Sequence, residues 1–347
     1  MKKYKFAIAG CGTIGAIHAE CINQIDNAEL SAVYDANEEN SKKLSSVYNC
    51  CCYSDLNQML SNEDIDIVCI CTPSGLHAEY GIKCAQAKKH VICEKPIETT
   101  IEKAESLIKA CEQEGVKLSV ISQHRFDKCI VELKRAIDAG ELGKLCFGES
   151  FTKWYRSREY YESSKWRGTW KLDGGGALIN QSIHYIDLLQ YLLGPVREVY
   201  GVCSSMGHNG IEVEDEALAT VRFKNGAIGM IEGNTNAYPG FFTRLDIYGE
   251  KASVVVENDN ITMWKNRNGT ERKTEFINGT AEAYSSASSS RVSNFNSHIQ
   301  QFKDVIQAIE DDRKPKVDGY EALKPLRIIM AVYESNKTGR PVIFKDC

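Results

Sequence analysis

Hydrophobic and polar positions in the first 123 residues follow two alternating patterns. Short apolar runs predict strands over residues 4–9, 30–34, 65–70, 90–93 and 116–122. Between them, apolar residues recur at helical spacing, which predicts helices following residue 15 and over 55–60, 76–88 and 101–114. Strands that alternate with helices in this way indicate a doubly wound parallel sheet of the Rossmann type.

The pattern changes after residue 123. A helix is expected over 125–139, a strand over 145–151 and a helix over 177–193 that ends at Gly194-Pro195. Alternating segments separated by Gly or Asn turns predict one antiparallel sheet, with strands over 199–204, 216–223, 227–233, 242–248, 252–257 and 260–264. A serine-rich loop over 285–293 and helices over 295–310 and 320–338 follow. We therefore predict an α/β protein with two domains. These are a nucleotide-binding domain at 1–123 and, at 124–347, an α/β domain with a large open, mainly antiparallel sheet.

The predicted second sheet has two faces, and the predicted helices can cover only one of them. About six strands with helices on one face leave the other face to cover, so we expect the chain to form homo-oligomers, either dimers or tetramers. Candidates for the covered face are Ile228, Met230, Leu245 and Ile247.

The amino-acid composition limits which partners and which cellular compartment we expect for this protein. The 347 residues carry a formal net charge of −5, which argues against a nucleic acid as the main partner. The 14 cysteines form no CxxC pairs, no secretory signal is recognised and no apolar run reaches membrane-spanning length. We expect a cytoplasmic protein with reduced thiols. No His/Cys cluster has metal-site spacing, so no metal is predicted.

The first strand runs into a glycine turn and then a helix. Glycines in this turn allow the backbone to approach a pyrophosphate, which would lie at the positive end of the helix. The turn is Gly10-Cys11-Gly12-Thr13-Ile14-Gly15. The second strand ends at Asp35, which is placed to accept hydrogen bonds from a ribose diol and to repel a 2′-phosphate. The predicted cofactor is NAD rather than NADP.

A further strand ends in Glu94-Lys95-Pro96, and ligands of parallel sheets bind at the carboxyl ends of strands. Lys95 is therefore directed toward the expected ligand crevice, although an ordinary surface pair with Glu94 is the alternative for so short a motif. In the helix after Gly174-Gly175-Gly176, Asn180 and His184 share one face at i, i+4 spacing. For His184 the alternative is a core histidine of an amphipathic helix.

These motifs, together with Cys71-Thr72-Pro73, resemble the Gfo/Idh/MocA family of sugar and cyclitol dehydrogenases, in the same order and over nearly the whole chain. The resemblance implies an NAD-dependent oxidoreductase that oxidises a secondary hydroxyl by hydride transfer to nicotinamide. Lys95 and His184 would be the catalytic residues, and the second domain would carry the substrate site. An imidazole titrates near neutrality and is suited to act as the base.

The resemblance also assigns binding residues. Besides the glycine turn and Asp35, the expected cofactor contacts are Thr72, Pro73, His77, Glu94, Lys95, Gln123, Trp166 and Arg167. The expected substrate contacts are Lys95, Arg156, Arg158, Asn180, Gln181 and His184. For Arg156 and Arg158 a solvated surface loop is an equally good interpretation.

One position departs from the common family pattern, which has an Asp four residues before the His where this chain has Asn180. With Trp166-Arg167-Gly168-Thr169-Trp170, the segment looks like the branch that includes UDP-N-acetylglucosaminuronate 3-dehydrogenases. A nucleotide-sugar substrate, such as a UDP-sugar uronate oxidised at C3, is one expectation. The alternatives on the same fold are an NAD-binding sensor without catalysis and an NAD-dependent glycosidase.

Overall fold

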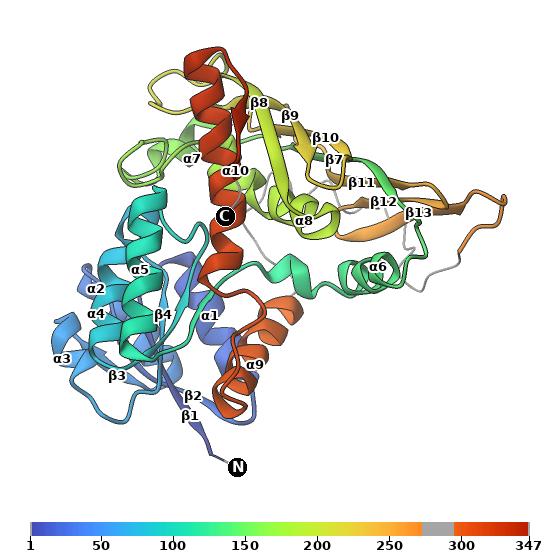
Figure 1. The fold of residues 1–347 in the computed structure, drawn as a ribbon. Helices are drawn as coiled ribbons and strands as arrows, with labels where there is room; N and C mark the ends of the chain where they lie inside the picture. The colour runs from blue at the N-terminus through green and yellow to red at the C-terminus, as the bar shows by residue number, and fades with distance from the viewer. Residues whose placement is uncertain (1, 273–294, 346–347) are drawn as a thin grey trace. The chain divides into compact units, whose positions relative to one another are not determined.

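The computed structural model describes residues 2–272 and 295–345 (Figure 1). The chain forms two compact units, the first from residues 1–123 and 293–323 and the second from 124–292 and 324–347. The two-domain expectation had the same division after residue 123 but placed residues 293–323 in the second domain. The loop expected over 285–293 lies outside the described residues.

The first unit is built on a six-stranded parallel sheet, which confirms the predicted Rossmann-type fold. Its order is β3-β2-β1-β4-β5-β6. The bounds are β1 Tyr4–Ala9, β2 Ala28–Tyr34, β3 Cys51–Tyr53, β4 Ile67–Ile70, β5 His90–Cys93 and β6 Leu118–Val120. Strand order reverses between β1 and β4, so the carboxyl ends of these two strands flank the position where such sheets bind ligands.

The helices of the first unit are α1 Thr13–Asn23, α2 Glu38–Tyr48, α3 Leu56–Leu60, α4 His77–Gln86, α5 Ile101–Glu114 and the 3-10 turn η1 Ser74–Leu76. Sequence patterns did not predict α2 or β3. Helix α2 buries only Ser41 and Leu44, so it lacks a clear apolar period, and its start is fixed by the Asn37 side chain, which accepts from the Glu39 N–H. Strand β3 has only three residues at the edge of the sheet.

Helix α9, Asn296–Glu310, belongs to the first unit although it begins about 175 positions after β6 ends. The ring of Phe302 stacks on Phe6 at 5.9 Å between centroids and meets the ring of His18 edge-on at 5.1 Å. Phe302 is fully buried in the same apolar core as α1 and β1. This long-range packing is why the boundary of the unit could not be found from local patterns.

The second unit contains an eight-stranded sheet, and the prediction of a mainly antiparallel sheet is confirmed. The order is β13-β12-β11-β7-β10-β9-β8-β14, with β7 and β10 the parallel neighbours. The bounds are β7 Leu145–Lys153, β8 Val196–Ser204, β9 Glu216–Phe223, β10 Ile228–Asn234, β11 Thr243–Gly249, β12 Ala252–Glu257, β13 Asn260–Asn266 and β14 Val342–Ile343. The sheet is larger than the predicted six strands because β7 joins it centrally and β14 pairs with β8.

The helical segments of the second unit are α6 Lys128–Asp138, α7 Arg158–Glu162, the π-helical turn η3 Ala177–Ser182, α8 Ile183–Leu193 and most of α10, Gly319–Thr338. The 3-10 turn η2, Gln123–Phe126, crosses the division between the units. The single α-helix predicted over 177–193 is wrong in its first turn and a half, which is π-helical. Helix α8 packs on β7, where the absence of a side chain at Gly148 makes room for Leu189 and Leu193.

The surface candidates on the second sheet divide into two groups. Ile228 is 47% exposed and Met230 is half-buried, but Leu245 and Ile247 are fully buried, so the expectation for these two was wrong. Alternation gives the period of a strand but not which of its faces meets the helices.

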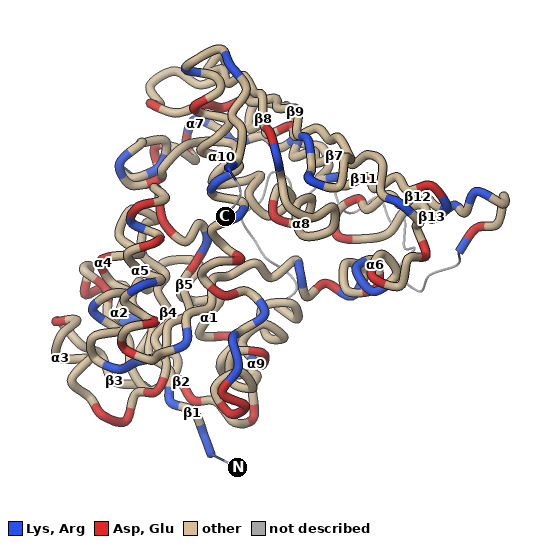
Figure 2. Tube along the Cα trace, viewed as in Figure 1, with Lys and Arg blue, Asp and Glu red and all other residues tan. Residues whose placement is uncertain are grey.

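Charged residues of both signs are distributed over the described part of the chain (Figure 2). Lys and Arg are interspersed with Asp and Glu along both units (Figure 2). Among the described residues, none of the helices combines the length and the apolar character needed to cross a membrane.

Candidate active site

The glycine turn of the first unit is shaped by two close backbone contacts and one open position. A Cβ on Gly10, which has φ +101°, would lie 2.5 Å from the carbonyl oxygen of Cys71, and one on Gly15 would lie 2.1 Å from that of Gly10. By contrast, nothing lies within 4 Å of a Cβ built on Gly12. Gly12 precedes α1, whose N-terminus has no side-chain cap. This open N-terminus, where Thr13 and Ile14 begin α1, fits the pyrophosphate of a dinucleotide.

Asp35 follows β2 and is held by the backbone on both sides. Its Oδ2 accepts from the Cys11 N–H at 2.6 Å and its Oδ1 from the Asn37 N–H at 2.8 Å. The side chain is half-buried, and each carboxylate oxygen retains a second lone pair. The geometry fixes a carboxylate next to the glycine turn, which fits a ribose diol.

Two polar atoms near the carboxyl ends of β4 and β6 have no hydrogen-bond partner among the described residues. They are the buried Oγ1 of Thr72 and Oε1 of Gln123. Buried polar atoms are normally paired, so their exceptions call for a ligand or water. Together with the open position at Gly12, they fit a cofactor that lies along this edge of the sheet.

His77 connects two of the loops at this edge. Its Nδ1 lies 2.7 Å from the carbonyl oxygen of Pro96 and its Nε2 lies 3.0 Å from that of Thr72. The ring is 1% exposed, and burial lowers its pKa. His77, which the sequence assigned to the cofactor, therefore spans the loop after β4, where Pro73 lies, and the loop after β5.

Glu94 is buried, and its carboxylate forms hydrogen bonds inside the first unit. Its Oε1 lies 2.8 Å from Nε2 of His18, and its Oε2 accepts from the Lys95 N–H at 3.1 Å. Burial opposes ionisation, but His18, His298 and Lys95 together lower the pKa of Glu94 to about 2. The ionised carboxylate thus fixes the backbone at Lys95, whose side chain is half-buried.

In the second unit, the turn η3 begins on a buried carboxylate. Glu214 accepts from the N–H of Gly176 at 2.9 Å, from the N–H of Leu178 at 2.9 Å and from the hydroxyl of Tyr333 at 2.9 Å. Burial raises the pKa of Glu214 to about 7, although these three donors act in the opposite direction. A Cβ on Gly176 would lie 1.7 Å from the Glu214 carbonyl oxygen, so the glycine is required by this contact.

The two residues expected at helical spacing have different surroundings. Asn180 lies in η3 and its Nδ2 donates to Oδ1 of the buried Asp173 at 2.6 Å. His184 lies in the first turn of α8, half-buried, with its ring 5.0 Å from the ring of His124. The π-helical turn replaces the α-helical spacing assumed for the pair, and such turns are frequent at functional sites.

Two of the three expected arginines gather on one aromatic ring. The guanidinium of Arg167 lies 4.1 Å and that of Arg156 lies 5.1 Å from the ring centre of Tyr160. The Tyr160 hydroxyl accepts from Nε2 of Gln181 at 3.2 Å. Trp166 packs against Arg167 at 5.1 Å, and Arg167 Nε is buried without a hydrogen-bond partner among the described residues.

Arg158 is not part of this cluster. Its side chain is 80% exposed and forms an i, i+4 pair with Glu162 at 2.6 Å, so it occupies a solvated surface position.

Sequence patterns missed three residues that hold the site residues in place. They are His18, Asp173 and Glu214. His18 and Glu214 act through contacts distant in sequence, and Asp173 acts through a contact seven positions away; no local motif marks these contacts.

Comparisons with known proteins bear on the family and the fold of the chain. Residues 4–122 match an oxidoreductase family with an NAD-binding Rossmann fold, and residues 130–255 match the GFO/IDH/MocA C-terminal domain. The chain is similar to the WlbA dehydrogenase from Bordetella pertussis, solved in complex with NADH and UDP-GlcNAcA. The two are 32% identical, covering 100% of this chain and 99% of that chain, with a TM-score of 0.89.

Curated relatives include the myo-inositol 2-dehydrogenase of Thermotoga maritima, 27% identical over 99% of both chains. The scyllo-inositol 2-dehydrogenase (NAD(+)) of Bacillus subtilis is 28% identical over 72% of both chains. The chain belongs to the Gfo/Idh/MocA family of NAD-binding oxidoreductases.

Proposed function

We propose that this protein is an NAD-dependent dehydrogenase that oxidises a secondary hydroxyl of an anionic sugar, most specifically a UDP-sugar uronate at C3. The observation that carries the substrate class is the pair of guanidiniums of Arg156 and Arg167 on Tyr160, which Gln181 connects to η3. Arginines bind carboxylates and phosphates through paired hydrogen bonds. The WlbA dehydrogenase complex with UDP-GlcNAcA supports the same class of ligand.

The cofactor, when bound, supplies a nicotinamide that accepts the hydride. The protein's own side chains remove the hydroxyl proton and stabilise the negative charge that develops on the oxygen. In this proposal the neutral imidazole of His184 takes the hydroxyl proton, while the ammonium of Lys95 stabilises the developing alkoxide. Asn180 and Gln181 would hydrogen-bond the sugar. The glycine turn, Asp35 and the unpaired oxygens of Thr72 and Gln123 would hold NAD.

The decisive experiment follows nicotinamide absorbance with NAD and a panel of UDP-sugar uronates, neutral UDP-sugars, free sugars and inositols. We expect reduction of NAD with a UDP-sugar uronate and slower turnover with the neutral UDP-sugar. Reduction of NAD with inositols but not with the UDP-sugar uronate would contradict the proposed substrate class.

The same assay tests the two alternatives. A sensor would bind NAD and sugar without turnover, and an NAD-dependent glycosidase would cleave a glycoside without net reduction. The dehydrogenases among the relatives favour net oxidation.

We also propose that the protein self-associates and works in the cytoplasm. The cysteines that the structure describes are free thiols, which supports a reducing compartment. Self-association is supported by exposed apolar residues on β8, β9 and β10, namely Tyr200, Val202, Leu218 and Ile228, each 42–50% exposed.

A further inference from the structure

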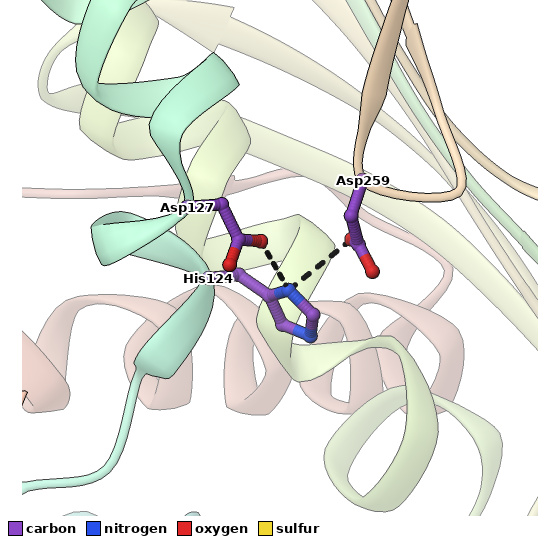
Figure 3. Close-up of side chains that lie close together, drawn as sticks. All are labelled: His124, Asp127 and Asp259. Atoms are coloured by element: carbon purple, nitrogen blue, oxygen red, sulfur yellow. Dashed lines mark hydrogen bonds and ion pairs between the residues drawn. The ribbon is translucent and has the colours of Figure 1, made fainter. Parts of the chain in front are cut away.

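Three side chains from separate segments of the second unit meet at one histidine nitrogen (Figure 3). His124 comes from η2, Asp127 precedes α6 and Asp259 lies in the turn between β12 and β13. Nδ1 of His124 lies 2.7 Å from Oδ2 of Asp127 and 3.1 Å from Oδ1 of Asp259. Both distances are those of hydrogen bonds, so Nδ1 carries a proton that the two carboxylates share.

Two carboxylates on one imidazole favour its charged form. Although burial opposes the charge, Asp259 and Asp127 raise the pKa of His124 well above its ordinary value. The charge of His124 in turn lowers the pKa of Asp259. The cluster therefore pairs an imidazolium at His124 with the carboxylates that accept from it.

The same three ligand atoms lie within 4.8 Å of one another, a spacing that a divalent cation also allows. The hydrogen-bond distances favour a proton at Nδ1, because a metal there would have to displace it. Metal analysis distinguishes the two.

The ring of His124 meets the ring of His184 edge-on, with centroids 5.0 Å apart and planes at 77°. From α8, the hydroxyl of Tyr185 donates to Oδ1 of Asp259 at 3.0 Å. Arg125, next to His124, is held in a buried bidentate pair with Asp187, so its charge is compensated. The cluster therefore holds a charged group next to the His184 ring, with 5.0 Å between the ring centroids.

We propose that His124 is a positioning residue for His184: as an imidazolium anchored by Asp127 and Asp259, it fixes the orientation of the His184 ring and offsets the negative charge of both carboxylates. The inference rests on the proposed role of His184 as the base. In this chain Asn180 cannot supply charge to His184 as an Asp would, whereas the neighbouring cluster contains charged groups.

The proposal predicts opposite effects from two charge changes. His124→Asn keeps a side-chain N–H for the carboxylates but removes the positive charge, so His184 should bind its proton more tightly. Asp259→Asn removes a negative charge and should have the reverse effect. The His124 and His184 ring centroids lie 5.0 Å apart. Loss of a unit charge about 5 Å away should shift the His184 pKa by about 0.5 to 1 pH unit in His124→Asn, and the shift in Asp259→Asn should have the opposite sign.

The first measurement is the pKa of the His184 ring, from NMR of the imidazole nitrogens in the NAD-bound protein, with His184→Asn to assign the signal. The second is the apparent pKa of the acid limb in the pH profile of kcat. Asp138→Asn, at the exposed end of the same helix α6, is the matched control and should change neither. Relative to the wild type, we expect the His184 pKa and the apparent pKa of the acid limb to be higher in His124→Asn and lower in Asp259→Asn.

Unchanged His184 pKa values in both folded variants would overturn the inference, as would shifts in the same direction. One equivalent of divalent metal in the wild type that is lost in His124→Asn would also overturn it. If His124→Asn does not fold, the result for Asp259→Asn alone tests the inference. The Asp259 side chain is 45% exposed, so its substitution should leave the fold intact. NMR shifts of the expected sign in an enzyme whose His184→Asn variant stays active would refute the proposed base but not the coupling.

Discussion

At the scale of single residues, Lys95 and His184 are the side chains on which the proposed chemistry depends. Lys95→Ala should lower kcat by on the order of 10²-fold, as removal of one oxyanion donor does. His184→Asn should lower kcat by about 10²- to 10⁴-fold because the general base is lost. NAD affinity, measured by calorimetry, should stay close to wild type in both. A double variant that retained most of its turnover would refute the assignment.

We predict that the choice between NAD and NADP also depends on one residue, Asp35. Asp35→Ser removes the charge that repels a 2′-phosphate and avoids placing an amide NH2 against the Cys11 or Asn37 N–H. A charged hydrogen bond contributes about 1.5–3 kcal/mol, so the preference for NAD over NADP should shrink by about tenfold or more. Titration of both cofactors measures it. Tighter binding of NADP than of NAD by the wild type would contradict the prediction.

The contact between Asn180 and Asp173 explains why an amide suits position 180 here. Asn180→Asp would place two carboxylates within hydrogen-bond distance in a buried site and should cost about 1–3 kcal/mol of unfolding free energy. Asp173→Asn in the same chain should recover most of that loss. Urea unfolding of the wild type, both single variants and the double variant tests this coupling. Additive effects would show that the two side chains do not interact.

At the scale of elements, the turn η3 depends on Glu214. Burial raises the pKa of Glu214 to about 7, so the folded protein keeps a proton that the unfolded chain, with its ordinary value of 4.5, has released. The stability contributed by this proton is fully present below about pH 4.5 and is lost as the pH rises through about 7. The unfolding free energy of the wild type relative to Glu214→Gln should therefore decline between about pH 5 and pH 8.

Urea unfolding at several pH values provides the measurement for Glu214. The exposed Glu212, whose carboxylate accepts from the Trp170 N–H at 3.0 Å, offers the control substitution Glu212→Gln. A difference between wild type and Glu214→Gln that does not change with pH would contradict the assigned titration.

At the scale of the whole molecule, we predict that the exposed apolar residues of the eight-stranded sheet form the contact of the proposed oligomer. Val202 and Leu218 are directly opposed on β8 and β9, and each is 50% exposed. Leu218→Lys should dissociate the proposed oligomer, because a charge would be buried in an apolar contact. Met206→Lys, at a position 82% exposed outside the strands, should leave assembly unchanged. Sedimentation at micromolar concentration measures both, and a monomeric wild type would refute the prediction.

The sequence by itself determined the local elements and which residues follow the ends of the strands. It placed the glycine turn after β1, Asp35 after β2 and Lys95 after β5, as the structure has them, because apolar period, glycine and proline act over a few neighbouring residues. Family membership was recognised from the same motifs and is confirmed.

Only the tertiary structure decided which distant segments pack together. It placed α9 on α1, inserted β7 between β10 and β11, and brought Asp259 to His124 across more than a hundred residues. It also turned Leu245 inward. The physical reason is that period and turn residues specify a segment's conformation, whereas its partner is selected by burial and charge compensation among all segments at once.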